Sequence, residues 1–562
     1  MKTITVRANE ISQPVYAGAG SRITLTGSGR VEWAAVEKLQ DALNGATWNT
    51  WPAGSTAGYR DTERGLAVRV VGTGACTVTI EEGKGDPANE GAYWQPVGDG
   101  VSAIANPLTG VIEKSAGGKR MYIGTRRFHS VVMLSNYCAL DGVTDDTAGF
   151  AAAMAAVPAG GALYLGEAGQ VALVRVSATD PTAAIDLDGF DGRGMFGAAT
   201  IKQADNVPAG ITIMRGVCHN SYFAGFTLDG NVTARNPGAY GPEGEGFNPK
   251  NSTGLTVEYV TVVSCHQDAF DFDDCSDCYL YRCVAQDCWG DGYHMGGSVV
   301  GVYNTNTVID TCVSVGCGQE RRASGDPYGE GFSIAGTRNK IINCTSINDQ
   351  RGIRCESANS VVCGNIIVDC GADGATGDVA ILIDTSSLAT VVSGNIVPST
   401  SSKAGSVGIK VTGIRNVISN NSVKNNKTGI EVGGSFNTVE GNQTNTSDTG
   451  ILISGAANWS FVRNNTLETS WYGVRADSSK ARIAGNSIVT ATEQGIDLRA
   501  GSCVVSGNEV INGSKFGVRM FNASVTGCTV FNNVIDATSG GVSLAGTGHL
   551  VSNNVVNGAY VP

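Results

Sequence analysis

The sequence predicts an all-β protein whose main part is a right-handed parallel β-helix, a single-stranded solenoid that adds one coil per repeat. Segments that begin with Gly and an aliphatic residue recur about every 22 residues at Gly408, Gly429, Gly450, Gly473, Gly495, Gly517 and Gly541. An Asn precedes most of these glycines by eight or nine residues, and no repeat contains a helix-length apolar segment. Repeats of this length stack on one another to bury their apolar faces, and stacked coils of short strands form parallel sheets.

The repeated asparagines predict a ladder of side-chain amides that hydrogen-bond along the stack. Cysteines occupy the same position in earlier coils, so we predict columns of buried, reduced thiols rather than the alternative of a disulfide framework. The Asn positions are Asn421, Asn442, Asn465, Asn486, Asn508 and Asn533. The thiol columns are Cys283, Cys312 and Cys344, continued by Asn365, and Cys265, Cys288 and Cys317.

The N-terminal part of the chain does not follow the repeat. Residues 1–105 contain alternating runs such as SRITLTGSGRVEWAAV between Gly-rich turns, which predict a small antiparallel β domain. We interpret residues 106–135 as a connector and residues 136–562 as the β-helix. Thr144 or Asp145 begins a predicted helix at about 145–157, whose apolar face would cover the open end of the solenoid.

Composition excludes several functions. The formal net charge is -12 and the pI is near 5.0, which disfavours nucleic acid and anionic membrane surfaces as partners because both attract clustered Lys and Arg. No apolar run reaches the ~18 residues of a membrane span, so we expect no membrane insertion. The first residues, MKTITVRANEISQPVY, lack the apolar run of a secretory signal.

Aligning the earlier coils on the Gly position reveals two positions with polar and charged residues. The residue one before that position is Glu245, Asp268, Asp291, Glu330 and Arg351 in successive coils. The residue two after it is Asn248, Asp271, His294, Ser333 and Arg354. The residue one after it is aromatic or aliphatic and points inward, so the residue two after it points outward. Later coils carry uncharged residues one before the Gly, and we predict that charge at this register is confined to these five coils.

Stacked acids of this kind suit the cleavage of a glycosidic bond. Neighbouring coils lie about 4.8 Å apart, so like charges raise some of the pKa values and leave a protonated acid beside an ionised one. Glycosidases use such a pair, with a separation that depends on whether the enzyme retains or inverts configuration. The predicted catalytic residues are Asp268, Asp291, Glu245, Asp271, Glu330 and His294, and the choice between a retaining and an inverting pair stays open.

Two insertions precede the charged positions and predict the walls of a substrate groove at about 240–360. They read NVTARNPGAYGPEG and GQERRASGDPYG, and insertions in a solenoid gather on one face, often the binding face. The predicted substrate-binding residues are Arg351, Arg354, Arg321, Glu320, Tyr328, Tyr240 and Asn248. We predict no cofactor and no metal, although a calcium ion at Asp268, Asp271 and Asp277 is an alternative, and so is a simple solvated charged face.

Three motifs carry a resemblance to a known family. The segment DGVTDDT with the helix and the GGALYL strand after it, together with TIKQ (200–203) and FTLDGN (226–231), resembles the pectate-lyase-superfamily domain of bacteriophage tailspikes and related polysaccharide depolymerases. The order of EGEGFN, QDAFDF, GDGYHM, GEGFSI and RGIRCE also resembles polygalacturonases, where Arg354 would match a sugar-binding Lys. That family's NTD motif and its adjacent DD pair are missing, so the resemblance implies the groove location and leaves the substrate open.

The resemblance implies a phage tailspike that depolymerises a bacterial surface polysaccharide (capsule, O-antigen or exopolysaccharide). It further implies a homotrimer in the virion, attached to the phage tail or baseplate through residues 1–105, made in the host cytoplasm and acting at the host cell surface. Glycoside hydrolysis by an endo-acting enzyme is the favoured activity. A polysaccharide lyase using His294, Arg351 and Arg354, a receptor-binding spike without catalysis, and a bacterial secreted or cell-surface enzyme are the alternatives.

Overall fold

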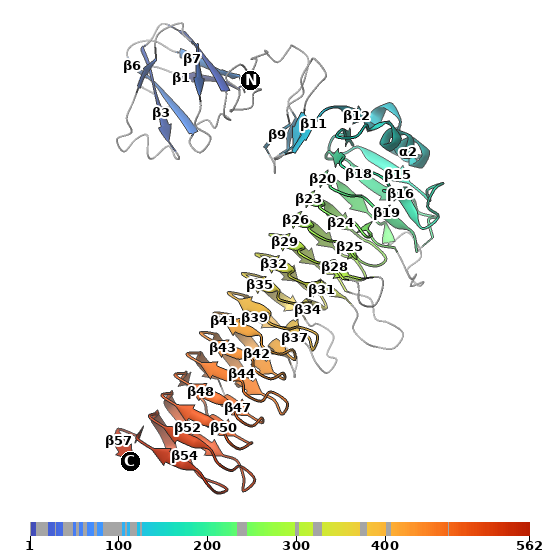
Figure 1. Ribbon diagram of the computed structural model, residues 1–562. Coiled ribbons are helices and arrows are strands. Elements are labelled where there is room, and N and C mark those ends of the chain that lie inside the picture. Colours follow the sequence, from blue (N-terminus) through green and yellow to red (C-terminus); the bar gives the residue numbers. More distant parts are fainter. Residues whose placement is uncertain are drawn as a thin grey trace. The chain divides into compact units, whose positions relative to one another are not determined.

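The computed structural model describes residues 128–208, 210–232, 244–297, 303–318, 329–370, 379–400, 406–469 and 471–561, together with the strands of the segment before them (Figure 1). The chain divides into two compact units, Met1–Arg127 and Phe128–Pro562. The predicted substrate-binding residues Tyr240, Glu320, Arg321 and Tyr328 lie outside the described residues.

The first unit contains small antiparallel sheets, as its alternating runs predict. One sheet has the order β1 (Lys2–Val6), β7 (Cys76–Glu81), β2 (Ser21–Gly27) and β5 (Thr56–Tyr59). A second has the order β4 (Asn49–Trp51), β3 (Arg30–Val36) and β6 (Gly65–Val71). Short pairs are formed by β8 (Ile104–Asn106) with β9 (Gly110–Ile112), and by β10 (Met121–Ile123) with β11 (Arg126–Phe128).

The second unit is a stack of coils whose described strands all pair in parallel, except for one terminal hairpin. A 17-stranded sheet contains one three-residue strand from each coil. In order, its strands are β12 (Val131–Met133), β14 (Ala162–Tyr164), β17 (Gly194–Phe196), β20 (Tyr222–Ala224), β23 (Thr256–Glu258), β26 (Tyr279–Tyr281), β29 (Val308–Asp310), β32 (Lys340–Ile342), β35 (Val361–Cys363), β38 (Val391–Ser393), β41 (Val417–Ser419), β43 (Thr438–Glu440), β45 (Phe461–Arg463), β48 (Arg482–Ala484), β51 (Val504–Ser506), β53 (Thr529–Phe531) and β55 (Leu550–Ser552).

The other strands form a 29-stranded sheet in which most coils contribute two segments, so the coil has three strand positions. Its first strands are β13 (Asp141–Asp145), β15 (Val171–Val174), β16 (Ala183–Asp186), β18 (Thr200–Gln203), β19 (Thr212–Gly216), β21 (Thr227–Asp229), β22 (Phe247–Pro249), β24 (Thr261–Val263), β25 (Phe270–Asp273), β27 (Val284–Gln286), β28 (Tyr293–Gly296), β30 (Val313–Val315), β31 (Glu330–Thr337), β33 (Thr345–Ile347) and β34 (Arg351–Ala358).

The sheet continues to the end of the described chain, where β56 and β57 form the antiparallel hairpin. These strands are β36 (Ile366–Cys370), β37 (Val379–Ile383), β39 (Ile396–Thr400), β40 (Val407–Val411), β42 (Ser422–Val432), β44 (Gln443–Ile453), β46 (Thr466–Thr469), β47 (Tyr472–Ala476), β49 (Ser487–Val489), β50 (Gln494–Leu498), β52 (Glu509–Met520), β54 (Val534–Ser543), β56 (Asn554–Val556) and β57 (Ala559–Val561). The predicted parallel coil is therefore confirmed throughout the described repeats (Figure 1).

Aromatic rings stack inside the coil behind the charged positions. The rings of Phe270 and Tyr293 lie parallel with their centroids 4.8 Å apart, and Tyr293 and Phe332 lie 4.7 Å apart. All three side chains are fully buried, and stacked rings add to the free energy of burial. This inward column fixes the register, so the residues on either side of it in each strand are turned outward.

The predicted amide ladder is present and is longer than the sequence indicated. From Asn365 through Asn554, each side-chain nitrogen lies 2.8–3.0 Å from the side-chain oxygen of the next Asn, and Asn395 belongs to the ladder. Cys344 precedes it and donates its backbone N–H to Asn365 Oδ1 at 2.8 Å. All 15 cysteines in the part of the chain that the structure describes are free.

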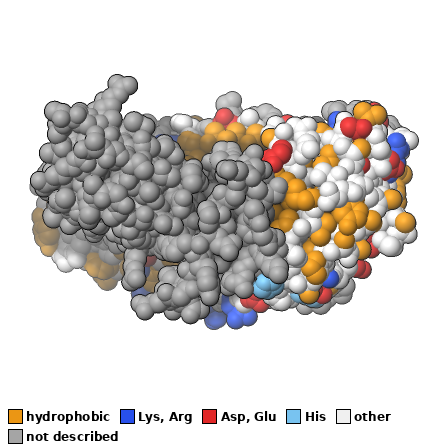
Figure 2. Space-filling model, turned by 90° about the horizontal axis from the view of Figure 1, so that it is seen from above, with side chains coloured by type: hydrophobic (Ala, Val, Ile, Leu, Met, Phe, Trp, Pro, Cys, Tyr) orange, Lys and Arg blue, Asp and Glu red, His pale blue; other side chains and the backbone are white. Residues whose placement is uncertain are grey.

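The predicted cap is the helix α2 (Thr147–Ala156), which contacts β16 and the 3-10 turn η1 (Leu134–Asn136). Its Phe150 and Ala153 are buried in the core of the coil. Asp145 accepts the N–H of Thr147 at 3.1 Å, whereas Asp146 instead binds the backbone of Ala139 at 2.7 Å. Seen from above, hydrophobic side chains are also exposed in the part of the molecule that carries this cap (Figure 2). None of the described helices is long and apolar enough to cross a membrane.

Candidate active site on the outer face of the coil

The two predicted outward positions form columns in the structure. Asp271 lies opposite His294 in the parallel pairing, His294 lies opposite Ser333, and Ser333 lies opposite Arg354. Glu330 lies opposite Arg351 in the same way. The alignment of coils on the Gly position therefore gave the correct register.

Five carboxyl groups gather here although they point outward, and we call them with His294 the acidic site. Their exposed fractions are 4% for Glu245, 3% for Asp268, 6% for Asp271, 2% for Asp291 and 7% for Glu330. Carboxyl groups are rarely buried to this degree unless they are paired or functional. The His294 side chain is 30% exposed, so the site is open to solvent at the imidazole.

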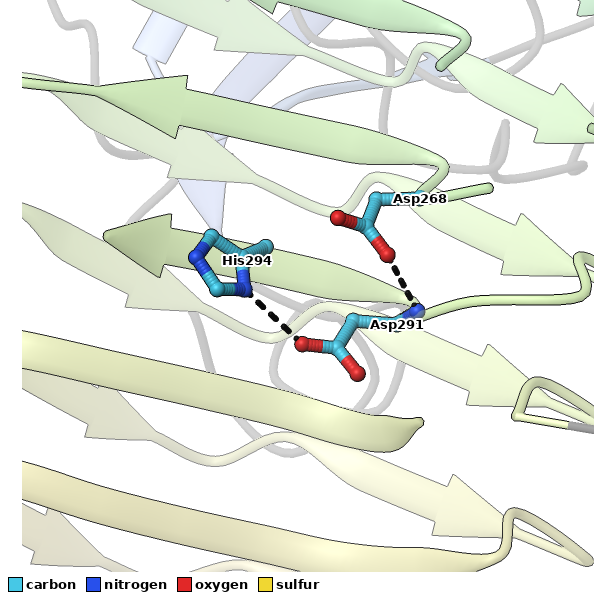
Figure 3. Close-up of side chains that lie close together, drawn as sticks. All are labelled: Asp268, Asp291 and His294. Atoms are coloured by element: carbon cyan, nitrogen blue, oxygen red, sulfur yellow. Dashed lines mark hydrogen bonds and ion pairs between the residues drawn. The ribbon is translucent and has the colours of Figure 1, made fainter. Parts of the chain in front are cut away.

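Asp268, Asp291 and His294 form the centre of the acidic site (Figure 3). The backbone N–H of Asp291 donates to Asp268 Oδ1 at 2.5 Å, and His294 Nδ1 lies 3.0 Å from Asp291 Oδ2. The other Asp291 oxygen accepts the N–H of Glu330 at 2.6 Å. The acid of one coil thus orients the backbone that carries the acid of the next coil. The imidazole of His294 is held against the carboxylate of Asp291.

Arginines border the acidic site on the side of the later coils. Arg351 forms an ion pair of 2.5 Å with Glu330, and Arg354 lies 3.9 Å from the same carboxylate. Arg354 also pairs with Glu356, and with Asp384 at 3.0 Å. The guanidinium groups are consequently fixed by acids on both sides.

On the side of the earlier coils, Asn248 donates a hydrogen bond to Asp271 Oδ2, and Thr212 donates one to Glu245. The side-chain oxygen of Asn248 and the Oδ1 atom of Asp271 are buried and have no hydrogen-bond partner among the described residues. Two buried acceptors without donors are costly. They suit a ligand that offers hydroxyl or N–H groups.

The surroundings shift several pKa values in the direction that like charges and burial require. Burial raises the pKa of Asp268 well above its ordinary range, and the charge of Asp291 adds to this. Burial also raises the pKa of Asp271, and it raises the pKa of Glu330 to about 8 with help from Asp291. Burial alone would lower the pKa of His294, but the hydrogen bond with Asp291 and the neighbouring acids raise it well above its ordinary value. These carboxyl groups therefore keep their protons, and the imidazole keeps its charge, to higher pH than they would in an exposed position.

Charge one residue before the Gly position is confined to these coils, but the position two residues after it also carries charge in later coils. The column of Asp271 and His294 continues to Lys410 and Glu431, which form an ion pair of 3.2 Å. Further on, the fully buried Asp497 lies between Arg499 at 2.7 Å and Arg519 at 2.8 Å. Opposite charges alternate in these later coils and compensate one another, whereas one residue before the Gly position the acids Glu245, Asp268, Asp291 and Glu330 follow one another in successive coils. The acidic site therefore differs from the later coils in that its neighbouring charges have the same sign, and not simply in that it is charged.

Asp268, Asp291 and His294 could also hold a metal ion, since each offers a ligand atom within 4.8 Å of the others. The calcium alternative at Asp268, Asp271 and Asp277 finds no such support. Asp277 is exposed, lies beyond the end of β25 and accepts a hydrogen bond from Asn306 at 3.0 Å. A separate surface pocket lies between α2 and β16 and contains none of these residues.

Sequence reasoning missed four residues of this region. Arg215 lies opposite Asn248 in the pairing of β19 with β22, so it extends the outward column by one coil. Glu356 and Asp384 pair with Arg354, and the alignment could have found both had it been extended along each strand. Asp349 lies inside the coil behind Glu330, where only its position in the cysteine column gave a signal.

The sequence profile described as "Right handed beta helix region" matches residues 245–413 and 407–557. A search of characterised protein sequences found no significant match.

Similar solved structures include the tailspike of Escherichia coli bacteriophage HK620 in complex with a pentasaccharide (14% identity, 79% of this chain and 83% of that chain, TM-score 0.46). A thermostable α-1,3-glucanase from Streptomyces thermodiastaticus is also similar (11% identity, 97% and 90% covered, TM-score 0.32). So is a mannuronan C-5 epimerase module from Azotobacter vinelandii (16% identity, 76% and 99% covered, TM-score 0.27).

The profile match runs over more than half of the 562 residues and coincides with the observed parallel coils. The chain therefore belongs to the right-handed β-helix family.

Proposed function

We propose that this protein is a bacteriophage tailspike that binds a bacterial surface polysaccharide at the acidic site and cleaves it by acid–base glycoside hydrolysis. The observation that carries the proposal is the central pair of buried acids from neighbouring coils, in which the Asp268 carboxyl group accepts the backbone N–H of Asp291 and His294 lies against the Asp291 carboxylate. Stacked acids are costly to a fold. The acidic site keeps these acids together although they destabilise the fold, and it includes an acid, Glu330, whose pKa is raised to about 8. Glycosidic cleavage needs such a protonated acid beside an ionised one.

Asp268 is the proposed general acid because its raised pKa lets it keep a proton to higher pH than an ordinary carboxyl group. It would donate this proton to the glycosidic oxygen as the bond to the anomeric carbon breaks. Asp291 is the proposed carboxylate partner because it accepts hydrogen bonds from the Glu330 N–H and from His294. It would either attack the anomeric carbon or take a proton from the attacking water, and its negative charge would stabilise the developing oxocarbenium ion.

The nearest ligand atoms of Asp268 and Asp291 lie within 4.8 Å of each other. Retaining glycosidases have carboxyl groups about 5–5.5 Å apart, and inverting ones about 6.5–9.5 Å. The pair of neighbouring coils therefore favours retention of configuration. A pair two coils apart, Asp268 with Glu330, would give inversion instead, and the configuration of the product decides between them.

A polysaccharide lyase is the second candidate, because arginines adjoin the imidazole. A lyase needs a base to remove the proton next to the sugar carboxylate. The acids that pair with Arg354 outweigh its burial and raise its pKa, and Arg351 is held by Glu330 at 2.5 Å. Arginines fixed in this way suit carboxylate binding better than base catalysis.

The proposal also assigns residues 1–105 to attachment at the phage tail and the functional spike to a homotrimer in the virion. Both assignments rest on the resemblance of the segment at residues 136–165 to tailspikes. Sedimentation of the full chain measures the number of copies. A monomer at micromolar concentration contradicts the trimer and leaves the chemistry of the acidic site untouched.

The deciding experiment incubates the protein with purified surface polysaccharide of a candidate host and follows fragment size, new reducing ends and ultraviolet absorption. Hydrolysis produces short fragments with new reducing ends and no absorption, whereas a lyase leaves an absorbing unsaturated sugar at each cut. NMR of the first product gives its anomeric configuration. Binding without fragmentation, on a polysaccharide that the protein retains, contradicts the enzymatic proposal and supports a receptor-binding spike.

A further inference from the structure

The interior of the coil carries a column of thiols that is interrupted by one carboxyl group. Cys265, Cys288, Cys317 and Cys370 are buried, and each follows a residue with a left-handed φ. In the coil between Cys317 and Cys370 this place belongs to Asp349, which follows Asn348 with a φ of 53°. Asp349 is 0% exposed. An interior carboxyl group costs folding free energy, although its neighbours show that a thiol fits the same position.

The Asp349 carboxyl group binds the wall of the coil directly behind the acidic site. Its Oδ1 accepts the N–H of Cys317 at 2.7 Å, and its Oδ2 accepts the hydroxyl of Ser346 at 2.5 Å. Gly331 packs directly against this carboxyl group, because a Cβ atom at position 331 would clash with Asp349 Oδ2. Asp349 thus lies against the backbone immediately after Glu330.

The outer side of the same backbone is held by Asp291, which accepts the N–H of Glu330 at 2.6 Å. The segment Glu330–Gly331 therefore lies between an outward carboxyl group and an inward one. Asp349 also precedes Arg351 by two residues, and Arg351 is the partner of Glu330 at 2.5 Å. The interior side chain of Asp349 therefore contacts the segment that carries Glu330 and belongs to the segment that carries Arg351.

We propose that Asp349 is a positioning residue of the acidic site, which holds Glu330 and Arg351 in place from inside the coil and transmits its own charge to the acids outside. This inference rests on the proposed function of that site. The groups that face Asp349 are Asp291 through the wall, the thiols of Cys317 and Cys370, and the hydroxyls of Ser314 and Ser346. Burial raises the pKa of Asp349 to about 7, and Asp291 adds to the shift. The residue consequently ionises in the pH range in which the acidic site would work.

The test compares Asp349→Asn and Asp349→Cys with the wild-type protein. Asn keeps the shape and loses the charge, and Cys restores the thiol that neighbouring coils carry. Cys370→Ser is the matched control, because it changes the next member of the column without altering its charge. Each full-length variant is assayed for circular dichroism, thermal unfolding at acid and alkaline pH, and the pH profile of kcat and KM on the polysaccharide.

Both Asp349 variants should fold, and kcat should fall roughly tenfold or more with little change in KM, because a misplaced acid slows chemistry more than binding. Without the negative charge of Asp349, the outer acids lose their protons more easily, so the alkaline limb of the profile should move to lower pH. Cys370→Ser should keep both properties.

An Asp349 variant that matches Cys370→Ser in kcat and in pH profile overturns the inference. Failure of both Asp349 variants to fold overturns it too, because the residue would then serve the fold itself. A wild-type protein that cleaves no polysaccharide contradicts the proposed function instead, and in that case the pH dependence of unfolding still reports on the interior carboxyl group.

Discussion

The backbone N–H of Asp291 donates a hydrogen bond of 2.5 Å to Asp268 Oδ1 in the preceding coil. The N–H of Glu330 repeats this relation one coil later, with Asp291 Oδ1 as the acceptor at 2.6 Å. Each acid thus fixes the backbone that carries the next acid, so the three carboxyl groups form one hydrogen-bonded series along the solenoid. A substitution at one member is expected to change the orientation of its successor as well as its own chemistry.

Replacing Asp268 or Asp291 by Asn tests the central pair. Asn keeps the hydrogen-bond acceptor and removes the proton chemistry, so turnover should fall on the order of a hundredfold or more while the fold is retained. The measurement is the release of reducing ends from the host polysaccharide. Glu440→Gln, in the surface pair of Glu440 with Arg463, is the control and should change little. Near wild-type rates in both single mutants would place the chemistry elsewhere.

Replacing Arg351 tests the pairing with Glu330. Burial and Asp291 raise the pKa of Glu330 to about 8 even though Arg351 lowers it. Arg351→Leu should therefore raise this pKa further and move the alkaline limb of the activity profile to higher pH, opposite to the shift expected for Asp349→Asn. Arg351→Lys keeps the charge and should move it less. An unchanged limb in Arg351→Leu would mean that Glu330 does not titrate in the rate-limiting step.

The buried acids make stability depend on pH with a definite sign. Glu330 ionises near its ordinary 4.5 in the unfolded chain and at about 8 in the folded one, and Asp349 changes from 3.8 to about 7. The unfolded chain releases protons that the folded chain keeps, so the free energy of unfolding should fall as pH rises between about 4 and 8. Denaturant midpoints across this range measure the slope. The slope should decrease in the double variant Glu330→Gln with Asp349→Asn, and an unaltered slope would contradict these raised pKa values.

The amide ladder should be a major source of stability in the later coils. Asn465 donates to Asn486 Oδ1 at 2.9 Å and to the Val439 carbonyl at 3.0 Å. Asn465→Ala leaves several buried groups without partners, at about 1–3 kcal/mol each, so the free energy of unfolding should fall by more than about 2 kcal/mol. Asn445→Ala removes an exposed hydrogen bond to Glu468 and should cost less than about 0.5 kcal/mol. Equal losses in the two variants would show that the ladder adds nothing specific.

The thiol columns should remain reduced. Cys283, Cys312 and Cys344 are free and fully buried, so alkylating reagents should leave them unmodified in the native protein. After denaturation without a reductant, mass spectrometry should find the label on all three. Missing label on any of them would mean a disulfide and would contradict the stacked-thiol arrangement.

The repeat, and with it most of the fold, follows from the order of residues alone. The recurrence of Gly and Asn fixes the length of a coil, and the apolar residue after the Gly position fixes the register, because a shift by one residue would expose every member of the stacked column of Phe270, Tyr293 and Phe332. For the same reason the outward column of Asp271, His294 and Arg354 followed from the sequence, since residues in register must stack along a solenoid.

Which of the aligned residues meet, and how their pKa values shift, depends on the folded coil. The carboxyl group of Asp268 accepts the backbone N–H of Asp291, and no alignment of side chains reveals this contact. Asp277 does not join the acidic site, because it lies on the surface beyond the end of β25. The later coils also carry outward charges, but Lys410 with Glu431, and Asp497 with its arginines, compensate one another. Pairing, burial and pKa depend on distances of a few ångströms between separate coils, and a linear sequence specifies the order of residues but not these distances.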